Sequence, residues 1–288
     1  MATRGSMQSV LITGTSSGFG LHAAVEAARR GWRVFATMRN LGRRAALDEA
    51  AAAAGVTDRL EVTRLDVTDP ASVEEGARDV LARAGGRLDA VVHNAGVAVG
   101  GAFEDVPDAE QRRVMETNFW GVLALTRALL PAFRAQRSGR IVVVSSNSAY
   151  AGEPANAVYV ASKWAIEGWA ESLAFEVGTF GIDVVLVEPG SYKTEIWGTS
   201  PRILPEGSAY AGMMRHLEKV IDEKVLASAR DPREVAVVIA NALAARRPRF
   251  RYPVGPDAWI GHVVRGKLPT RVQRFLVSRL LGMHRVTP

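Results

Sequence analysis

The arrangement of apolar and polar residues changes along the chain between two patterns. Short continuous apolar runs, such as Ile141–Val144 and Val184–Val187, are typical of strands buried on both faces of a parallel sheet. The longer stretches between them repeat apolar residues at helical spacing. Strands are predicted at 8–13, 32–38, 60–65, 88–93, 140–145 and 183–188. Helices are predicted from the glycine-rich segment after the first strand to residue 30, and at 42–54, 71–84, 110–137, 157–180 and 232–245.

This alternation of strands and helices determines the fold class. Parallel strands joined by helical crossovers form a sheet with helices on both faces. We therefore expect an α/β fold, a doubly wound parallel sheet of the Rossmann type, as a single domain over residues 8–245. Residues 1–7 are expected to be an N-terminal extension, because the first strand begins almost at once after Met7. They lack the charged and then apolar build of a signal peptide. Residues 246–288 are expected to be a basic C-terminal extension.

Composition narrows the possible functions. The 288 residues are 48% hydrophobic and 23% charged, as in soluble globular proteins. The chain has no cysteine, which excludes disulfides, a thiolate nucleophile and a cysteine zinc site, and which fits a cytoplasmic location. No apolar run of about 18 residues exists, so no transmembrane helix is predicted. The five histidines show no metal-ligand spacing, so no metal site is predicted.

The net charge of +6 is concentrated at one end of the chain. Residues 246–288 hold ten Arg or Lys and one acid, Asp257, a balance of +9 that leaves −3 on the other 245 residues. No cluster of basic and aromatic residues resembles a nucleic-acid module, so no nucleic-acid partner is expected. An amphipathic helix is predicted in this tail from the apolar stripe Val272, Phe275, Leu276, Leu280 and Met283. Three interpretations stay open: packing on the body or on a partner subunit, binding to an anionic membrane, and a solvated tail.

The glycine-rich segment after the first strand predicts a dinucleotide site. In Thr13–Gly20, Gly14 and Gly18 let the backbone approach a pyrophosphate, and Gly20 permits close packing of helix on strand. The free N–H groups at the helix start favour an anion. The spacing Gly-x3-Gly-x-Gly differs from the common fingerprint, and an ordinary glycine-rich turn is the alternative.

The end of the second strand bears on which dinucleotide binds. NAD sites usually place an acidic residue there for the ribose hydroxyls. Ala36–Arg39 holds no acid, and Arg39 could bind a 2′-phosphate through two hydrogen bonds. A solvated surface arginine is the alternative. The sequence therefore favours NADP(H) over NAD(H).

Seven motifs occur in register along the chain. They are Thr13–Gly20, Leu65–Val67, Asn94–Gly96, Asn118, Ser146, Tyr159 with Lys163, and Pro189–Gly190. The order and spacing of these motifs resemble those of the short-chain dehydrogenases/reductases, and the resemblance covers residues 8–245. The stretches Arg33–Arg39 and Leu65–Asp69 are most similar to the hydroxysteroid- and retinol-dehydrogenase-like branch, which generally prefers NADP(H) and so agrees with Arg39.

The resemblance implies cofactor contacts residue by residue. Ser17 would contact the phosphates, Asp66 the adenine amino group, Asn94 the adenosine ribose, and Thr194 the nicotinamide carboxamide or the pyrophosphate. Phe19 stands where the family usually has isoleucine, and it could narrow the nicotinamide pocket. The complete expected cofactor set is Gly14, Ser16, Ser17, Gly18, Phe19, Gly20, Arg39, Asp66, Val67, Asn94, Ala95, Gly96, Tyr159, Lys163, Pro189, Gly190 and Thr194.

Tyr159 and Lys163 are four residues apart on a predicted helix, so their side chains share one face. A nearby ammonium is expected to lower the pKa of the phenol from about 10, which makes Tyr159 a usable general acid or base. Ser146, thirteen residues earlier and just past a strand, could donate a hydrogen bond to the substrate oxygen. By resemblance, Asn118 would bind a water that links Lys163 to solvent.

Alternatives to this assignment also exist. Tyr-x3-Lys arises by chance in many helices, and Asn118 could merely stabilise a helix bend. Ser145 and Ser148 rival Ser146, but only Ser146 has the family spacing to Tyr159.

Residues 191–230 correspond to the segment that covers the substrate in the family. Its apolar residues, Trp197 among them, favour a bulky apolar substrate, although they could simply pack the loop onto the body. Ser146, Tyr159 and Trp197 are the expected substrate contacts. We therefore expect an NADP(H)-dependent oxidoreductase that interconverts a secondary alcohol and a ketone, as a homo-oligomer (dimer or tetramer). The open alternatives are a regulator that binds NADP without turnover and a reductase held at a membrane surface by its tail.

Overall fold

A seven-stranded parallel sheet forms the centre of the protein in a computed structural model that describes residues 7–286, except for the side chains of Trp197 and Lys224. The strand order is β3-β2-β1-β4-β6-β7-β9, and every neighbouring pair is parallel. The strands are β1 (Ser9–Thr13), β2 (Arg33–Met38), β3 (Leu60–Arg64), β4 (Ala90–His93), β6 (Gly139–Val144), β7 (Ile182–Pro189) and β9 (Arg251–Val254).

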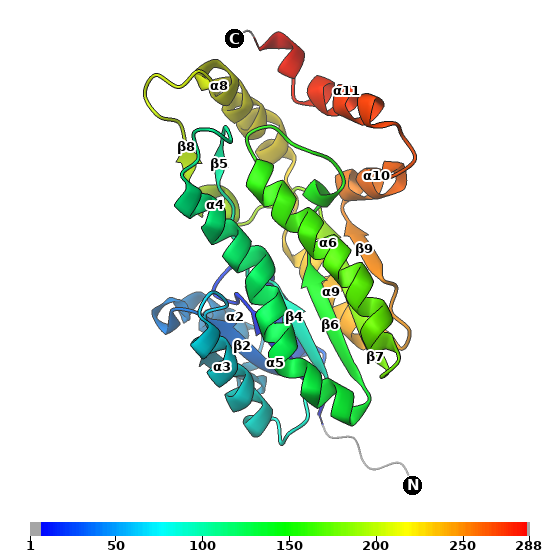
Figure 1. The fold of residues 1–288 in the computed structure, drawn as a ribbon. Helices are drawn as coiled ribbons and strands as arrows, with labels where there is room; N and C mark the ends of the chain where they lie inside the picture. Colours follow the sequence, from blue (N-terminus) through cyan, green and yellow to red (C-terminus); the bar gives the residue numbers. More distant parts are fainter. Residues whose placement is uncertain (1–6, 287–288) are drawn as a thin grey trace.

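Helices cover both faces of this sheet (Figure 1). The helices α3 (Pro70–Arg83), α5 (Gly121–Gln136) and α6 (Ala157–Gly178) cover the face turned to the viewer. The opposite face is covered by α1 (Gly18–Arg29), α2 (Ala45–Ala53) and α9 (Arg233–Ala244). Along β1, Val10 and Ile12 lie in one core and Leu11 lies in the other. The predicted doubly wound α/β fold is confirmed, with strands buried on both faces as their apolar runs indicate.

Helix boundaries follow the sequence signals closely. Asp69 caps α3 by accepting a hydrogen bond from the Ala71 amide at 3.0 Å, with Pro70 in the first turn. The helix predicted over 110–137 is interrupted. Its first part is α4 (Asp108–Met115), a π-helical turn spans Glu116–Trp120, and α5 completes it. The helix predicted over 42–54 likewise begins as a 3-10 turn, Leu41–Arg43, before α2.

The seventh strand, β9, was not predicted. It lies in the segment interpreted as an extension, yet it pairs with the carboxyl half of β7, from Leu186 opposite Arg251 to Pro189 opposite Val254. Its four residues include an arginine and Pro253, so they form no apolar run. Proline is tolerated there because β9 is the edge strand. The sheet therefore continues into the basic tail.

The helices α10 (Pro256–Val264) and α11 (Thr270–Leu280) follow β9, and a 3-10 turn spans Met283–Arg285. The segment 191–230, which showed little periodicity, holds two helices and a short strand. These are α7 (Ile196–Thr199), β8 (Arg202–Ile203) and α8 (Ala211–Val220), which runs into a π-helical turn over Ile221–Leu226. The strand β8 pairs with β5 (Gly100–Gly101) in a separate two-stranded sheet.

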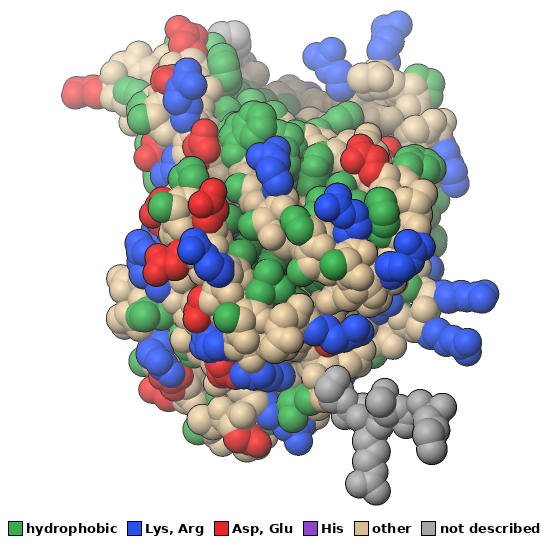
Figure 2. Space-filling model, turned by 60° about the horizontal axis from the view of Figure 1, so that its bottom comes forward, with side chains coloured by type: hydrophobic (Ala, Val, Ile, Leu, Met, Phe, Trp, Pro, Cys, Tyr) green, Lys and Arg blue, Asp and Glu red, His purple; other side chains and the backbone are tan. Residues whose placement is uncertain are grey.

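Surface charge is unevenly distributed. Figure 2 shows acidic and basic side chains interspersed over one side of the face that it brings forward, whereas basic side chains without acidic neighbours project along the opposite edge. The basic excess is thus a local property of the surface. None of the helices within residues 7–286 is long and apolar enough to cross a bilayer.

Candidate active site

The sequence-predicted site residues gather where β1, β4, β6 and β7 end. The turn after β1 is shaped by glycines that have no room for a side chain. Gly14 has a φ of 70°, and a Cβ there would lie 2.8 Å from Ala95 Cα. A Cβ on Gly20 would overlap the Asn94 amide and the Gly14 carbonyl. The turn therefore packs so closely against the segment after β4 that only glycine fits at these two positions.

The start of α1 offers unsatisfied N–H groups. Ser17 is the N-cap residue, and its side chain makes no capping hydrogen bond. The first turn of the helix holds no acidic residue of its own to neutralise the positive end of the dipole. Ser16 and Ser17 are both half-buried in this turn. These features fit the pyrophosphate of a dinucleotide.

Asn94 and Ala95 hold the glycine turn in place. The Asn94 side-chain amide donates hydrogen bonds to the carbonyls of Thr13 (2.9 Å) and Gly14 (3.1 Å). The backbone amides of Asn94 and Ala95 both donate to Thr13 Oγ1 at 3.0 Å. Thr194 approaches from the segment after β7, with its Cβ 3.7 Å from the position of a Cβ on Gly18. The structure thus brings these predicted cofactor residues together around one turn.

Three further predicted contacts lie toward the β3 edge of the sheet. One Asp66 oxygen accepts hydrogen bonds from the Thr68 amide (3.0 Å) and hydroxyl (2.8 Å), which fixes the carboxylate just after β3. Val67 beside it packs against Gly121 of α5. Arg39 directly follows β2 and is exposed, and no ion pair holds it among the described residues.

Phe19 and Trp197 were expected near the reacting end of the site. The Phe19 ring packs edge-on against Tyr192, with ring centroids 5.7 Å apart, so it contacts the segment after β7. Trp197 belongs to α7, but its side chain lies outside the described part of the structure.

Asn118 lies in the π-helical turn between α4 and α5. Its side-chain amide donates to the carbonyl of Val97 (2.9 Å) and to Ser162 Oγ (3.0 Å), and its oxygen accepts from the Val97 amide (2.9 Å). Asn118 therefore connects the loop after β4 to α6. Its contact on α6, Ser162, directly precedes Lys163. The π turn is what aims this side chain inward, a frequent arrangement at functional sites.

Lys163 is buried beside Tyr159. Its ammonium donates a hydrogen bond to the Val144 carbonyl at 2.9 Å and lies 5.6 Å from the centroid of the Tyr159 ring. Burial lowers the pKa of Lys163 to about 8, an effect that the nearby Glu167 carboxylate opposes. The side chain is thus still mostly cationic near neutral pH.

The pKa of Tyr159 differs from the expected direction. Burial raises it to about 12, while the neighbouring Ser146 hydroxyl acts to lower it and the Glu153 carboxyl adds to the rise. The expected lowering by Lys163 is absent, because the ammonium is directed at the Val144 carbonyl and desolvation of the phenol dominates. In this state Tyr159 is a protonated phenol at neutral pH.

Ser146 is distinguished from its two neighbours by its contacts. Ser146 Oγ accepts a hydrogen bond from the Ser148 amide at 3.1 Å and lies beside Tyr159. Ser148 Oγ instead donates to Glu153 at 3.0 Å. Ser145 Oγ is buried and has no hydrogen-bond partner in the described structure. The geometry thus groups Ser146, not its rivals, with Tyr159 and Lys163.

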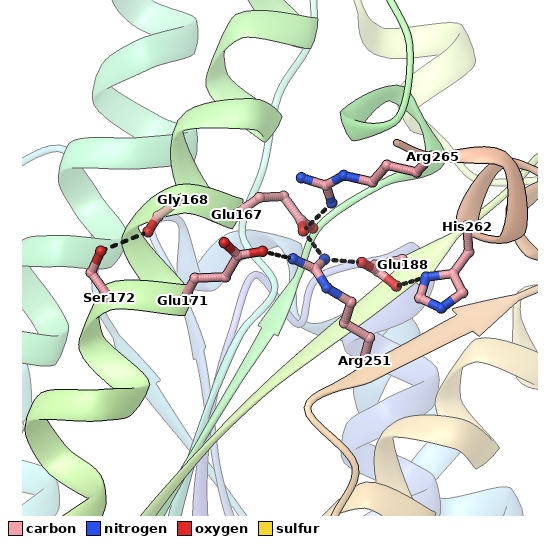
Figure 3. A network of polar contacts seen from close by, with 8 residues as sticks. All are labelled: Glu167, Gly168, Glu171, Ser172, Glu188, Arg251, His262 and Arg265. Carbon is pink, nitrogen blue, oxygen red and sulfur yellow. Dashed lines mark hydrogen bonds and ion pairs between the residues drawn. The ribbon is translucent and has the colours of Figure 1, made fainter. Parts of the chain in front are cut away.

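A network of charged side chains lies beside α6 (Figure 3). It comprises Glu167 and Glu171 of α6, Glu188 of β7, Arg251 of β9, His262 of α10 and Arg265. Arg251 contacts all three glutamates, and Arg265 donates to Glu167 at 3.1 Å. Glu167 and Glu188 are almost fully buried. This network joins the helix that carries Tyr159 and Lys163 to the two strands at the sheet edge.

No group of three or more metal-ligating side chains occurs in the described part of the chain. His93 is buried, with Nε2 2.9 Å from Thr126 Oγ1, and burial lowers its pKa to about 3. His93 is therefore a packed, hydrogen-bonded residue of the core.

Sequence reasoning missed the contribution of the C-terminal segment. Asp257 at the start of α10 accepts a hydrogen bond from the Ser191 amide at 2.7 Å, next to the Pro189–Gly190 turn. A single acid in a basic tail is the one signal that could have singled it out.

Comparisons with known proteins match this arrangement. A family profile described as short chain dehydrogenase matches residues 8–202. The chain is 40% identical over 276 residues to an uncharacterized oxidoreductase of Bacillus subtilis, YusZ, covering 94% of this chain and 97% of that one. It is 37% identical over 257 residues to retinol dehydrogenase 8 of Bos taurus (85% and 80% covered). It is 36% identical over 256 residues to human 17-beta-hydroxysteroid dehydrogenase type 1 (84% and 76% covered).

Solved structures are similar over most of the chain. A short-chain dehydrogenase from Streptomyces avermitilis has a TM-score of 0.78 at 33% identity, covering 99% of this chain and 100% of that one. A metagenomic short-chain oxidoreductase in complex with NADP has a TM-score of 0.67 at 27% identity (85% and 94% covered). A short-chain dehydrogenase/reductase from Burkholderia phymatum in complex with NAD has a TM-score of 0.72 at 25% identity (85% and 89% covered).

Proposed function

Because the chain belongs to the short-chain dehydrogenase/reductase family, in the branch most similar to hydroxysteroid and retinol dehydrogenases, we propose that it is an NADP(H)-dependent reductase of bulky apolar ketones. Its products would be the corresponding secondary alcohols. The observation that carries the proposal is the convergence of Ser146, Tyr159 and Lys163 at the carboxyl ends of the strands. The family membership supports the general chemistry, and the substrate class, the cofactor preference and the roles of individual residues are our inference.

The proposed proton transfer follows from the environment of Tyr159. Its phenol is protonated at neutral pH, since burial raises a pKa that is ordinarily about 10 to about 12, and it can give this proton to the carbonyl oxygen. The Ser146 hydroxyl would donate a hydrogen bond to the same oxygen as negative charge develops there. Lys163, buried beside the ring, would balance the phenolate that remains. The nicotinamide cofactor supplies the hydride when it is bound.

A substrate panel tests the proposed activity directly. We expect oxidation of NADPH with at least one ketone among steroids, retinoid-like compounds and long-chain keto compounds. The loss of the absorbance of the reduced nicotinamide would measure the rate. A regulator that binds NADP without turnover would bind the dinucleotide tightly and give no rate with any of them. Binding without turnover across the whole panel would therefore reject the enzyme and favour the regulator.

The preference for NADP(H) is proposed from Arg39. Similar structures hold NADP in one case and NAD in another, so the choice depends on local residues. Arg39 follows β2, where a ribose 2′-phosphate would lie, and it is exposed and available for that phosphate.

Replacing Arg39 with alanine should raise KM for NADPH about 10- to 100-fold, the loss of charge-assisted hydrogen bonds worth about 1.5–3 kcal/mol. KM for NADH should stay nearly constant. The matched control is Arg43→Ala, an exposed arginine in the next turn, which should change neither value. An unaltered NADPH preference in Arg39→Ala would remove the 2′-phosphate role from this residue.

A second candidate function, attachment to an anionic membrane surface, is favoured by α11. No residue of this helix is buried, and its apolar side chains Phe275, Leu276 and Leu280 are 61%, 49% and 72% exposed. Figure 1 shows α11 at the edge of the molecule, beyond α10. These three side chains therefore do not pack on the body, whereas packing on a partner subunit stays an open interpretation.

The charges around α11 fit negatively charged lipid headgroups. Arg271, Arg274, Arg279 and Arg285 surround the stripe and form no ion pair among the described residues. The only acid of the segment, Asp257, is directed at Ser191. An amphipathic helix with apolar and cationic faces binds anionic interfaces through both. We propose that α11 holds the enzyme at such a surface.

Vesicle co-sedimentation tests this attachment. The protein should bind vesicles that contain phosphatidylglycerol more tightly than vesicles of phosphatidylcholine alone, and added salt should weaken the binding. Exchanging Phe275 and Leu276 for serine should weaken binding tenfold or more, at about 1.5–3 kcal/mol per buried side chain. The control Phe175→Ser, at an 84% exposed site on α6, should have no effect.

Two results would contradict the membrane proposal. One is equal binding to both vesicle types, or no binding to either. The other is self-association that the double serine variant abolishes, which would assign the stripe to a second copy of the chain. A homo-oligomer and a cytoplasmic location remain predictions from the sequence.

A further inference from the structure

Asp257 places an acidic group of the C-terminal segment against the active site. It is the second residue of α10, and it follows the turn at Gly255, whose φ is 95°. One carboxylate oxygen, Oδ2, accepts a hydrogen bond from the Ser191 amide at 2.7 Å and a longer one from the Asn147 side chain at 3.4 Å. Ser191 directly follows Gly190, and Asn147 directly follows Ser146. A single carboxylate therefore joins the two segments that flank the reacting centre.

The packing around Gly190 explains why that residue is a glycine. A Cβ at Gly190 would overlap the Asp257 carboxylate. The Gly190 amide donates to the Val254 carbonyl at 2.9 Å, so the turn is also fixed through its backbone. The φ of Gly190 is not in the left-handed region, so close approach of Asp257, not backbone conformation, excludes a side chain.

The framework behind Asp257 is anchored at both ends. On one side, β9 pairs with β7, and Arg251 contacts glutamates of α6 and β7 (Figure 3). On the other side, Gly261 of α10 packs directly on the ring of the buried Tyr150. Tyr150 follows the 3-10 turn Asn147–Ala149, whose N-cap residue is Ser146. The carboxylate is therefore held by rigid elements instead of reaching out from a free loop.

We propose that Asp257 is a positioning residue that sets the distance between the Ser146 loop and the Pro189–Gly190 turn. It acts through Asn147 on Ser146, proposed above to face the substrate oxygen, and through Ser191 on the Pro189–Gly190 turn, which is expected to contact the cofactor. This inference rests on the proposed function for the roles of the two segments. It means that the edge strand and α10, which carry the basic tail, also complete the site.

The alternative role for this carboxylate is purely local. An acid in the first turn of a helix stabilises the helix through its dipole, and Asp257 has that position in α10. The two roles differ in what they change. A local role alters only the stability of α10, whereas a positioning role alters dinucleotide affinity and kcat. The geometry of Asp257 against Gly190 favours positioning.

The test compares Asp257→Ala with Asp257→Asn in the full-length protein. Asparagine keeps an oxygen that can accept from the Ser191 amide, and alanine does not. We expect Asp257→Ala to bind NADPH about tenfold more weakly, measured by the fluorescence of the reduced nicotinamide, and to lower kcat about 10- to 100-fold. Asp257→Asn should restore most of both.

A matched control separates the positioning role of Asp257 from an effect on helix stability. Asp108, the first residue of α4, is likewise an acid at a helix start, and it pairs with Arg112 on the surface. Asp108→Ala should lower Tm as much as Asp257→Ala does while leaving NADPH affinity and kcat unchanged. The binding assay needs no substrate, so weakened NADPH binding in Asp257→Ala supports the positioning role even if every ketone fails.

The proposal is overturned if Asp257→Ala binds NADPH and turns over as the wild type does. It is also overturned if the asparagine and alanine variants lose affinity equally and in proportion to their loss of Tm.

Discussion

Replacing Tyr159 with phenylalanine is expected to lower kcat for ketone reduction by about 10²–10⁴-fold, the usual contribution of a positioned general acid. Tyr159 sits between the Ser146 hydroxyl and the Lys163 ammonium, where its phenol is protonated at neutral pH. No other described phenol lies beside Ser146, and water would have to supply the proton to the alkoxide in the variant.

Phenylalanine suits this test because it changes little else. It keeps the volume of the aromatic ring and removes only the hydroxyl, so the fold and NADPH binding should persist. Steady-state kinetics with the best ketone of the panel, together with NADPH fluorescence titration, would separate kcat from binding. A fall in kcat at constant NADPH affinity is the expected pattern, because the lost contact belongs to the transition state.

A matched control uses a tyrosine remote from the reaction. Tyr252 of β9 accepts a hydrogen bond from the Arg249 amide through its hydroxyl, at 3.1 Å. Tyr252→Phe also removes one phenolic hydroxyl, yet kcat should stay within about twofold of the wild type. If Tyr159→Phe reduced ketones as fast as this control does, another group would be the proton donor and our mechanism would be wrong.

The sequence predicts the sheet and the catalytic grouping for identifiable reasons. Strands such as β6 and β7 are continuous apolar runs, so local composition alone indicates strands buried on both faces. Tyr159 and Lys163 share a helical face through their spacing of four. Ser146 is placed by its position just after a strand. Each of these predictions depends on residues that are near one another in the chain.

What the sequence could not predict depends on distant contacts. The four residues of β9 form no apolar run and contain proline, and only pairing with β7 makes them a strand. Asp257 meets Ser191 and Asn147 across 66 and 110 positions of sequence. The pKa of Tyr159 depends on how deeply the folded protein buries it, which the spacing to Lys163 does not report.

The buried network around Arg251 should dominate stability at the sheet edge. Arg251 is 16% exposed and contacts Glu167, Glu171 and Glu188, of which Glu167 and Glu188 are at most 1% exposed. We expect Arg251→Met to lower the free energy of unfolding by about 3–5 kcal/mol near neutral pH, because it leaves buried carboxylates without their main partner. Urea denaturation followed by circular dichroism would measure the loss.

A surface arginine provides the comparison. Arg44 pairs with Asp48 at 2.7 Å, but both side chains are nearly half exposed. Arg44→Met should therefore cost at most about 1 kcal/mol. A loss for Arg251→Met no greater than for Arg44→Met would show that the network contributes nothing beyond an ordinary surface ion pair.

The pH dependence of this loss identifies its cause. Burial and the neighbouring Glu167 raise the pKa of Glu188 from 4.5 to about 7, whereas Arg251 acts to lower it. A carboxyl with a raised pKa in the folded state binds more protons in the folded protein than in the unfolded one. It therefore stabilises the fold at pH values below the pKa of the unfolded state, and it loses that contribution as pH rises through about 7.

Without Arg251 the pKa of Glu188 rises further. The deficit of Arg251→Met should therefore be largest at about pH 8.5 and smaller at about pH 5.5, where protonation removes the unpaired charge. A deficit that is equal at both pH values would mean that lost packing of the arginine side chain, and not its charge, is responsible.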